Sequence, residues 1–403
     1  MNDIYICTPL RTPIGSFQGS LSKTRPDDLA AHILSAVVHQ SHVPAERIDE
    51  VFLGCANQAG EDNRNIARMA TLLAGLPQSV PAVTVNRLCA SGLEAVVQAY
   101  RSARCGDGEV FLAGGVESMS RAPYSMPRGP LFPKAGNLTV YDTSLGWRYP
   151  NPKMEALFPL EAMGCTAENI VERYQISRQE QDEFALASQQ KAIYAQAEGA
   201  FEAEISPVEV PEGRKKTRLF AHDEGPRKDS SLEKLSGLRA VFRQGGSVTA
   251  GNSSTLNDGA SAMLVCTKAA VQRYNLKPMA RIVACGSAGV DPTIMGIGPV
   301  PASQKALRRA GMSISDIDLF ELNEAFAAQS LGVLKELPVP IERVNVHGGA
   351  IALGHPLGCS GARILTTLIH ALHRYNKSIG LASLCVGVGQ GLSLIVEATD
   401  GIR

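Results

Sequence analysis

The chain lacks the features that mark nucleic-acid-binding, membrane and secreted proteins. Its 403 residues carry 39 Lys and Arg against 39 Asp and Glu, so no net charge attracts a nucleic acid or a membrane surface. No apolar run is long enough to span a bilayer, and residues 1–6 begin neither a secretory signal nor a transit peptide. These absences predict a cytoplasmic protein without nucleic-acid or membrane partners.

The cysteines follow no metal-binding or redox pattern. There are nine, an odd number, and no two of them form a C-x-x-C pair. This spacing argues against a zinc site or a thioredoxin-like pair. The length suggests about two or three domains, and a hydrophobic content of 44% is enough for large cores.

The chain contains two similar segments. Residues 45–54 and 313–322 each place an Ile-Asp pair before an apolar strand. Each is followed by a small-residue turn that opens a helix, and then by a Gly-rich strand. These turns and strands are Ser91-Gly92 with 110–116, and Ser360-Gly361 with 379–388. We interpret the pattern as an internal duplication, with chance similarity of short strands as the alternative. Alternating strands and helices predict α/β layers with largely parallel sheets.

Residues 121–246 differ in composition from the rest of the chain and are rich in Pro, Gly and Met. Seven prolines between Pro123 and Pro159 argue against regular elements early in this span. Helices are expected again at 166–174 and 178–197, the second with Ser177 and Glu180 as a capping box. We interpret the span as an inserted domain that covers the substrate. It would separate an N-terminal half, 1–120 with 247–275, from a C-terminal half, 276–403.

Cys89 is the first candidate catalytic residue. A β-branched strand is expected at 80–85, and helical spacing of apolar residues continues from Leu93 until Gly106. A thiol at a helix N-terminus meets unpaired N–H groups and the positive end of the helix dipole, which favour the nucleophilic thiolate. A buried structural cysteine is the alternative.

Three further positions carry chemistry. His355 lies among glycines and a proline and is a candidate general base, with His347 as its rival and a loop histidine without catalytic role as the alternative. Cys385 ends an apolar strand, and the glycines after it could offer N–H groups to an oxyanion. A nucleotide-binding loop is the weaker alternative, because no G-x-G-x-x-G opens a helix there. Asn323 follows the strand 319–322, where open α/β sheets place ligands.

Taken together, the motifs closely resemble the thiolase family, the acyl-CoA C-acyltransferases, in order over nearly the whole chain. The matching motifs are N-R-L-C-A-S-G at 86–92, T-A-G-N-S-S at 249–254 with N-D-G-A at 257–260, N-E-A-F at 323–326, G-G-A-I-A-L-G-H-P at 348–356 and C-V-G-V-G-Q-G at 385–391. The resemblance implies the thiolase fold. That fold has two duplicated α/β halves with mostly parallel mixed sheets in α-β-α-β-α layers, plus an inserted loop domain.

The resemblance also implies a mechanism. Cys89 would take the acyl group as a thioester, His355 would accept its proton, and Cys385 would be the second acid and base, acting at C2. One oxyanion site would use His355 and a water held by Asn323. A second would use the backbone N–H groups of Cys89 and Gly387. The reaction is thiolytic cleavage of a 3-oxoacyl-CoA or the reverse Claisen condensation, with coenzyme A and acyl-CoA as substrates and no metal or prosthetic group.

Coenzyme A contacts are implied at a further set of residues. Arg227 would contact the nucleotide, Phe242 would pack near the adenine, and Ser254 would approach the pantetheine. Ala325 and Phe326 of the N-E-A-F motif would also contribute to this binding site. The family forms homodimers that often pair into homotetramers, and we expect the same here.

Several positions bear on the acyl group. Ala162 stands where biosynthetic acetoacetyl-CoA thiolases have His, and C-V-G-V-G replaces their C-I-G-G-G. Segments 54–65 and 142–148 resemble 3-oxoadipyl-CoA thiolases of aromatic degradation, whereas 162–165 resembles general degradative 3-ketoacyl-CoA thiolases. His347 stands where Asn is common.

The sequence therefore favours a degradative 3-oxoacyl-CoA thiolase of fatty-acid β-oxidation. The alternatives are a 3-oxoadipyl-CoA thiolase and an acetoacetyl-CoA thiolase. A non-catalytic acyl-CoA- or lipid-binding protein is the alternative from another class, and the complete catalytic set argues against it. Arg148 is a candidate contact for a distal carboxylate, with a plain surface arginine as the alternative.

Overall fold

The computed structural model describes residues 3–129, 136–213 and 216–400. A ten-stranded mixed sheet runs through this part of the chain in the order β12-β13-β14-β11-β1-β10-β5-β3-β4, with β2 beside β10. Its strands are β1 (Ile4–Arg11), β2 (Gly15–Ser16), β3 (Glu50–Gly54), β4 (Ala82–Val85), β5 (Val110–Ser118), β10 (Asn257–Thr267), β11 (Pro278–Gly289), β12 (Leu319–Leu322), β13 (Ile379–Val386) and β14 (Gln390–Ala398).

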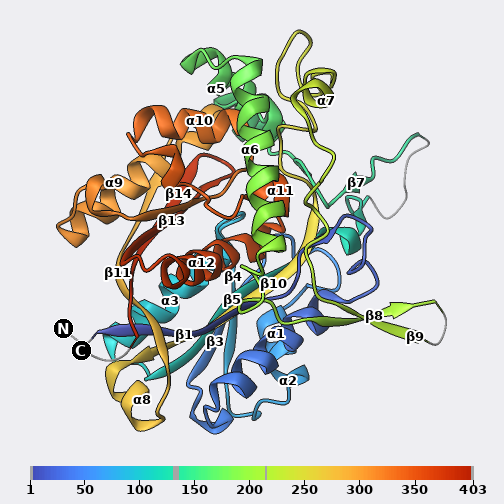
Figure 1. Ribbon diagram of the computed structural model, residues 1–403. Helices are drawn as coiled ribbons and strands as arrows, with labels where there is room; N and C mark the ends of the chain where they lie inside the picture. The colour runs from blue at the N-terminus through green and yellow to red at the C-terminus, as the bar shows by residue number, and fades with distance from the viewer. Residues whose placement is uncertain (1–2, 130–135, 214–215, 401–403) are drawn as a thin grey trace.

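Helices cover both outer faces of the sheet and fill the space between its two halves (Figure 1). The outer helices are α1 (Pro26–Ser41), α2 (Ile66–Leu73) and α8 (Lys268–Arg273) in the N-terminal half, and α9 (Pro299–Ala310) and α10 (Ala327–Glu336) in the C-terminal half. The central pair, α3 (Ser91–Cys105) and α12 (Leu357–Arg374), pack on each other and on strands of both halves. The predicted α-β-α-β-α layers are therefore confirmed.

The expected predominance of parallel strands is wrong. Among the described strands of this sheet, β3–β4, β3–β5 and β12–β13 pair in parallel, whereas the other neighbours pair antiparallel. Antiparallel neighbours need only a short turn, as between β13 and β14, whereas parallel ones need a crossover. The two halves also share one continuous sheet, because β1 pairs with β11 through Ile6 and Ala280.

The two halves repeat one hydrogen-bond pattern. The Asp49 carboxylate accepts backbone N–H groups from Glu109 at 2.7 Å and Val110 at 2.9 Å. The Asp318 carboxylate accepts those of Ser378 at 3.0 Å and Ile379 at 2.9 Å. Each aspartate thereby joins the entry of one parallel strand to that of its neighbour, β3 to β5 and β12 to β13. This equivalence is what the duplication interpretation requires.

The span between the halves is more regular than its prolines suggest. It holds two antiparallel strand pairs, β6 (Tyr124–Ser125) with β7 (Tyr141–Asp142) and β8 (Val208–Glu212) with β9 (Lys216–Phe220). Its helices are α4 (Pro152–Leu157), α5 (Met163–Tyr174), α6 (Arg178–Ala197) and α7 (Leu232–Ser236). Helix α4 begins at Pro152, which suits a first helical position because its missing N–H needs no partner there. The Ser177–Glu180 capping box and the bounds of α6 are confirmed, whereas α5 begins three residues earlier than predicted.

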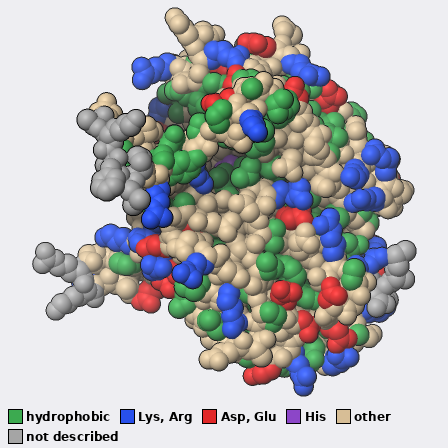
Figure 2. All heavy atoms as spheres, turned by 180° about the vertical axis from the view of Figure 1, so that it is seen from behind, with side chains coloured by type: hydrophobic (Ala, Val, Ile, Leu, Met, Phe, Trp, Pro, Cys, Tyr) green, Lys and Arg blue, Asp and Glu red, His purple; other side chains and the backbone are tan. Residues whose placement is uncertain are grey.

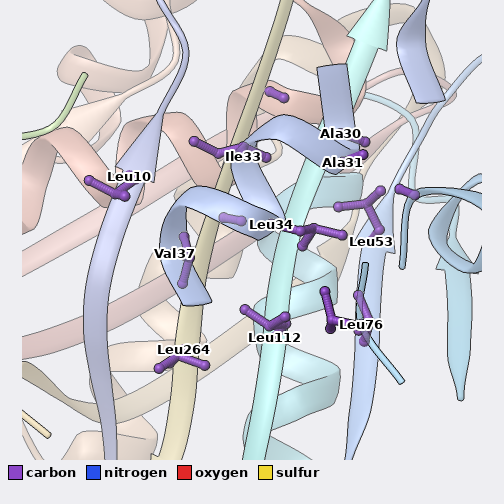
Figure 3. Close-up of a cluster of buried hydrophobic side chains, with 14 of the residues drawn as sticks. Leu10, Ala30, Ala31, Ile33, Leu34, Val37, Leu53, Leu76, Leu112 and Leu264 are labelled. Carbon is purple, nitrogen blue, oxygen red and sulfur yellow. The ribbon is translucent and has the colours of Figure 1, made fainter. Parts of the chain in front are cut away.

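The face drawn in Figure 2 mixes side chains of both signs of charge, as the balanced composition predicts. Below the surface, α1 buries Ile33, Leu34 and Val37 against strands of the N-terminal half (Figure 3). A second core joins the halves around α3 and α12, and a third lies under α9 and α10. Of the helices that the structure describes, none has both the length and the apolar character needed to cross a membrane.

The repeated aspartates predict a matched loss of stability. Asp49→Ala and Asp318→Ala each leave two backbone N–H groups without their charged acceptor, and each should lower the unfolding free energy by about 1–2 kcal/mol. The two sites lie in different halves, so the double variant should show the sum of the single effects. Chemical or thermal unfolding followed by circular dichroism measures this. Asp107→Ala, exposed in the loop before β5, is the control and should stay close to the parent protein.

Candidate active site

The beginnings of α3 and α12 meet at glycines. A Cβ on Gly92 would lie 2.7 Å from the carbonyl oxygen of Gly358, and a Cβ on Gly361 would overlap the backbone of Leu93. Only glycine allows helices to approach this closely. Cys89 and His355 each lie just before one of these helices, so the contact sets both at the same end of the central pair.

Cys89 lies in a tight loop ahead of α3. Leu88 has a positive φ of 46°, and the Ser91 hydroxyl accepts the Arg87 N–H at 2.9 Å and donates to the Leu88 carbonyl at 2.7 Å. Burial raises the pKa of the Cys89 thiol, while backbone N–H groups of Gly387 and of Cys89 itself partly offset this. The expected preference for the thiolate is therefore wrong for the resting protein, because burial outweighs the N–H groups.

His355 is buried and held in one orientation. Its Nδ1 lies 2.6 Å from the Ser360 hydroxyl, which donates to the Pro356 carbonyl at 2.8 Å. The ring therefore donates Nδ1–H to Ser360 and keeps the lone pair on Nε2. Burial lowers the pKa of His355 to about 3, with a smaller effect from Arg363. The imidazole is neutral near pH 7 and able to accept a proton.

Asn323 lies directly after β12, as predicted, and contacts the imidazole. Its side-chain nitrogen lies 3.3 Å from His355 Nε2, and its backbone N–H donates to the Ser383 carbonyl. Its buried Oδ1 has no hydrogen-bond partner among the described residues. A buried amide oxygen is normally paired with protein, water or ligand, which suits a water at this position.

Cys385 and Gly387 lie where β13 turns into β14. The strand expected at 379–388 ends at Val386, because Val388 and Gly389 adopt positive φ values of 62° and 79° in the turn. The glycine-rich segment therefore joins two strands and does not form a nucleotide-binding loop. Burial, and then the nearby Cys89, raise the pKa of the Cys385 thiol far above its ordinary value. The Gly387 N–H contacts Cys89, so the turn brings the two cysteine segments together.

His347, the rival base, lies elsewhere. Its ring stands 5.6 Å from Phe201 and 5.5 Å from Tyr375, measured between centroids. Neither ring nitrogen has a hydrogen-bond partner among the described residues, and burial lowers its pKa to about 4. Neither histidine is among the residues that line the cavity at Cys89, but His355 lies just before α12, which packs against α3 behind Cys89, whereas His347 does not.

A cavity of about 300 Å³ opens at Cys89. Figure 2, the view from behind, shows a hollow in the upper part of the molecule, edged by hydrophobic and cationic side chains. The Cys89 side of the cavity includes Leu88, Leu357, Gly387 and Val388. A second part of the wall comes from the inserted span, through residues 143–148 and 161–163. The insertion therefore forms part of the site, and Ala162 lies in the wall.

Glu117 is a site residue that the sequence analysis missed. It ends β5 and accepts backbone N–H groups from Ala56 at 3.0 Å, Asn57 at 3.2 Å and Gly358 at 2.8 Å. Burial raises the pKa of Glu117 to about 7, although the bonds from these N–H groups act to lower it. It thus ties the loop after β3 to the start of α12 beside the cavity. The sequence did contain a signal for this residue, because an acidic side chain is unusual at the end of an apolar strand such as the one that contains G-G-V-E.

Glu117 also belongs to a buried acidic group. Ligand atoms of Cys55, Asp62 and Glu117 lie within 4.8 Å of one another. Both Glu117 oxygens already accept backbone N–H groups, so the group works as a structural tie between loops.

The residues that we expect to contact coenzyme A lie in two separate parts of the structure. The Ser254 N–H donates to the Ala325 carbonyl at 3.0 Å, and Phe242 packs edge-on against Phe326 with centroids 6.0 Å apart. These aromatic rings share a hydrophobic cluster with Cys385. Arg227 is exposed on a different cavity, of about 380 Å³, beside α6. Their contacts with coenzyme A stay predictions.

Comparison with known proteins agrees with this architecture. Residues 4–269 match the family description "Thiolase, N-terminal domain" and residues 276–398 match "Thiolase, C-terminal domain". The chain is 52% identical to the 3-oxoadipyl-CoA/3-oxo-5,6-dehydrosuberyl-CoA thiolase of Escherichia coli K12, over 98% of this chain and 100% of that protein. It is 53% identical to the beta-ketoadipyl-CoA thiolase of Pseudomonas aeruginosa PAO1, over 98% and 99%.

A solved structure shows the same fold. Human mitochondrial 3-ketoacyl-CoA thiolase in complex with CoA superposes with a TM-score of 0.92 at 40% identity, covering 99% of this chain and 98% of that one. The family matches span both halves, and the catalytic motifs lie within them. The chain belongs to the thiolase family of acyltransferases.

Proposed function

We propose that the protein is a 3-oxoadipyl-CoA thiolase, which uses coenzyme A to cleave 3-oxoadipyl-CoA into acetyl-CoA and succinyl-CoA. The sequence favoured general fatty-acid β-oxidation and gave this activity as the alternative. The names of the two bacterial relatives, at 52% and 53% identity, support the alternative instead.

The observation that carries the proposal is where two sequence segments lie. Residues 54–65 and 142–148 are the segments whose sequence resembles 3-oxoadipyl-CoA thiolases. Both reach the cavity at Cys89, the first through Asn57 and the second through 143–148. Ala162 lies in the same wall and leaves space where a His would stand. The segments that suggest the substrate are therefore the ones that would touch its acyl chain.

The first chemical step joins Cys89 to the acyl group. The Cys89 sulfur attacks the C3 carbonyl of the substrate, and His355 takes the thiol proton on Nε2, the nitrogen left without a proton by the Ser360 contact. The backbone N–H groups of Gly387 and Cys89 stabilise developing negative charge. Donors of this kind are each worth roughly a hundredfold to a thousandfold in rate.

The second step releases acetyl-CoA. The bond between C2 and C3 breaks, and the buried Cys385 thiol gives its proton to C2. A succinyl thioester remains on Cys89, and coenzyme A then attacks its carbonyl to give succinyl-CoA. The coenzyme A thiol gives its proton to the Cys385 thiolate, and His355 returns its proton to the departing Cys89 sulfur. No step requires a metal or a prosthetic group. We also propose that the protein assembles into a homodimer or a homotetramer.

The two cysteines should separate in function. Cys89→Ala should lose thiolysis by at least about a thousandfold and accept no acetyl group from acetyl-CoA. Cys385→Ala should still acetylate at Cys89, yet lose thiolysis by about a hundredfold or more, because C2 lacks its acid. Intact-mass analysis with peptide mapping and a thiolysis assay measure both. Persistent acetylation in Cys89→Ala, or near-normal thiolysis in Cys385→Ala, would refute the corresponding role.

The raised pKa of Cys89 predicts a pH dependence. Burial lifts this pKa above its ordinary value of 9.0, so the thiolate fraction should rise about tenfold per pH unit from pH 6 to 9. Iodoacetamide labelling at Cys89, followed by mass spectrometry, should rise with the same slope. A plateau already present at pH 7 would mean a preformed thiolate. Buried Cys385 should stay unlabelled and serves as the internal control.

A substrate panel tests the proposed acyl group. We expect kcat/KM for thiolysis of 3-oxoadipyl-CoA to exceed that of acetoacetyl-CoA by at least about tenfold, a difference of about 1.4 kcal/mol. Chain length alone should give a graded preference, since each methylene adds only about 1–3 kcal/mol of discrimination. If acetoacetyl-CoA is instead the best substrate by tenfold, the protein is a biosynthetic thiolase.

A further inference from the structure

Arg148 is held over the cavity by two neutral oxygens. Its Nη1 donates to the Thr143 carbonyl at 2.8 Å, and its Nη2 donates to the Asn57 side-chain oxygen at 2.9 Å. The side chain is partly buried and lines the cavity together with Cys89. These bonds come from two different segments, the inserted span and the loop after β3, so the guanidinium is fixed between them.

Arg148 has no ion-pair partner among the residues that the structure describes. Of the described residues that line the cavity, Arg148 is the only cation. The two acidic residues that line the cavity, Glu117 and Glu161, form their hydrogen bonds and ion pairs with other groups. Glu117 accepts three backbone N–H groups, and Glu161 accepts from Asn169 at 2.8 Å and lies 3.9 Å from Arg243.

The unused hydrogen-bond donors of Arg148 indicate what kind of ligand group it could bind. A guanidinium has five N–H donors in one plane, and the contacts to Thr143 and Asn57 use two of them. Three N–H donors therefore remain for a further acceptor, and a carboxylate is the acceptor that a guanidinium binds most strongly. A ligand with a carboxylate at the far end of an acyl chain would supply both the charge and the acceptors.

We propose that Arg148 binds the terminal carboxylate of the acyl chain, with Asn57 as its positioning residue. This inference rests on the proposed function and identifies what would distinguish a dicarboxylic acyl chain from a plain one. The Asn57 backbone N–H donates to Glu117 at 3.2 Å, so the loop that holds Arg148 is tied to the end of β5. The carboxylate site is thereby fixed relative to the sulfur that the other end of the chain must reach.

The test compares two six-carbon substrates that differ only in the terminal group. They are 3-oxoadipyl-CoA, with a carboxylate, and 3-oxohexanoyl-CoA, with a methyl group. For each protein, the measured quantity is the ratio of kcat/KM for the first substrate to that for the second. Arg148→Gln should lower this ratio by about 30-fold or more, the range expected when one member of a buried charged pair is removed. Arg148→Lys should lower it less, because the charge stays but the paired donors are lost.

Two controls separate a local role from a structural one. Arg128→Gln removes an exposed arginine of the inserted span that does not line the cavity, and it should keep the parent ratio. Asn57→Ala should raise KM for 3-oxoadipyl-CoA more than for 3-oxohexanoyl-CoA while kcat changes less. An equal loss on both substrates in Arg148→Gln would mean that Arg148 only supports the loop, and it would overturn the inference.

The outcome for the parent protein keeps the two proposals apart. If it prefers 3-oxoadipyl-CoA and Arg148→Gln keeps that preference, the carboxylate site is wrong and the proposed function stands. If the parent protein shows no preference for the dicarboxylic chain, both the proposed function and the site are overturned.

Discussion

The close approach of α3 and α12 is the constraint on which the active site depends. Gly92 and Gly361 allow the two helix beginnings to touch, and Gly115 of β5 lies against the Gly358 carbonyl in the same place. A methyl group at any of these positions would meet backbone atoms, which cannot move aside as a side chain can. The contact joins the two halves of the chain at the point where each contributes one group, Cys89 from the first and His355 from the second. In the proposed mechanism, backbone packing therefore sets the position of the reaction.

Burial gives the site its proton chemistry. It raises the pKa values of Cys89 and Cys385 and lowers that of His355, so all three groups are neutral near pH 7. Desolvation always favours the uncharged form, whatever the sign of the ion. In the proposed mechanism, ions form only while substrate is present, and the Gly387 N–H of the β13–β14 turn contacts Cys89, where negative charge would develop. This mechanism needs no preformed thiolate, because the neutral His355 can accept the proton of the Cys89 thiol.

Local signals in the sequence predicted local structure well. Helix α3 ends with Gly106 in the left-handed conformation, Ser177 and Glu180 form their capping box, and Asn323 follows β12. The strand directions were not predictable in this way, since β1 pairs with β10 and β11 from distant parts of the chain, and periodicity carries no information about such partners. The roles of Glu117 and Asn57 were missed for the same reason, because their bonds link segments far apart in sequence. Motif similarity located the chemistry, whereas the wall of the acyl cavity required the fold.

Trp147 gives this cavity an optical property. It is the only tryptophan in the chain, it lines the cavity next to Arg148, and its indole N–H donates to the Glu161 carbonyl at 3.0 Å. Indole emission depends on the polarity and hydration around the ring. A single tryptophan, excited at wavelengths that the nine tyrosines do not absorb, has no background from other sites. The protein therefore carries a native fluorophore at the place where the acyl chain would enter, so that filling and emptying of the cavity can be followed in real time without any label.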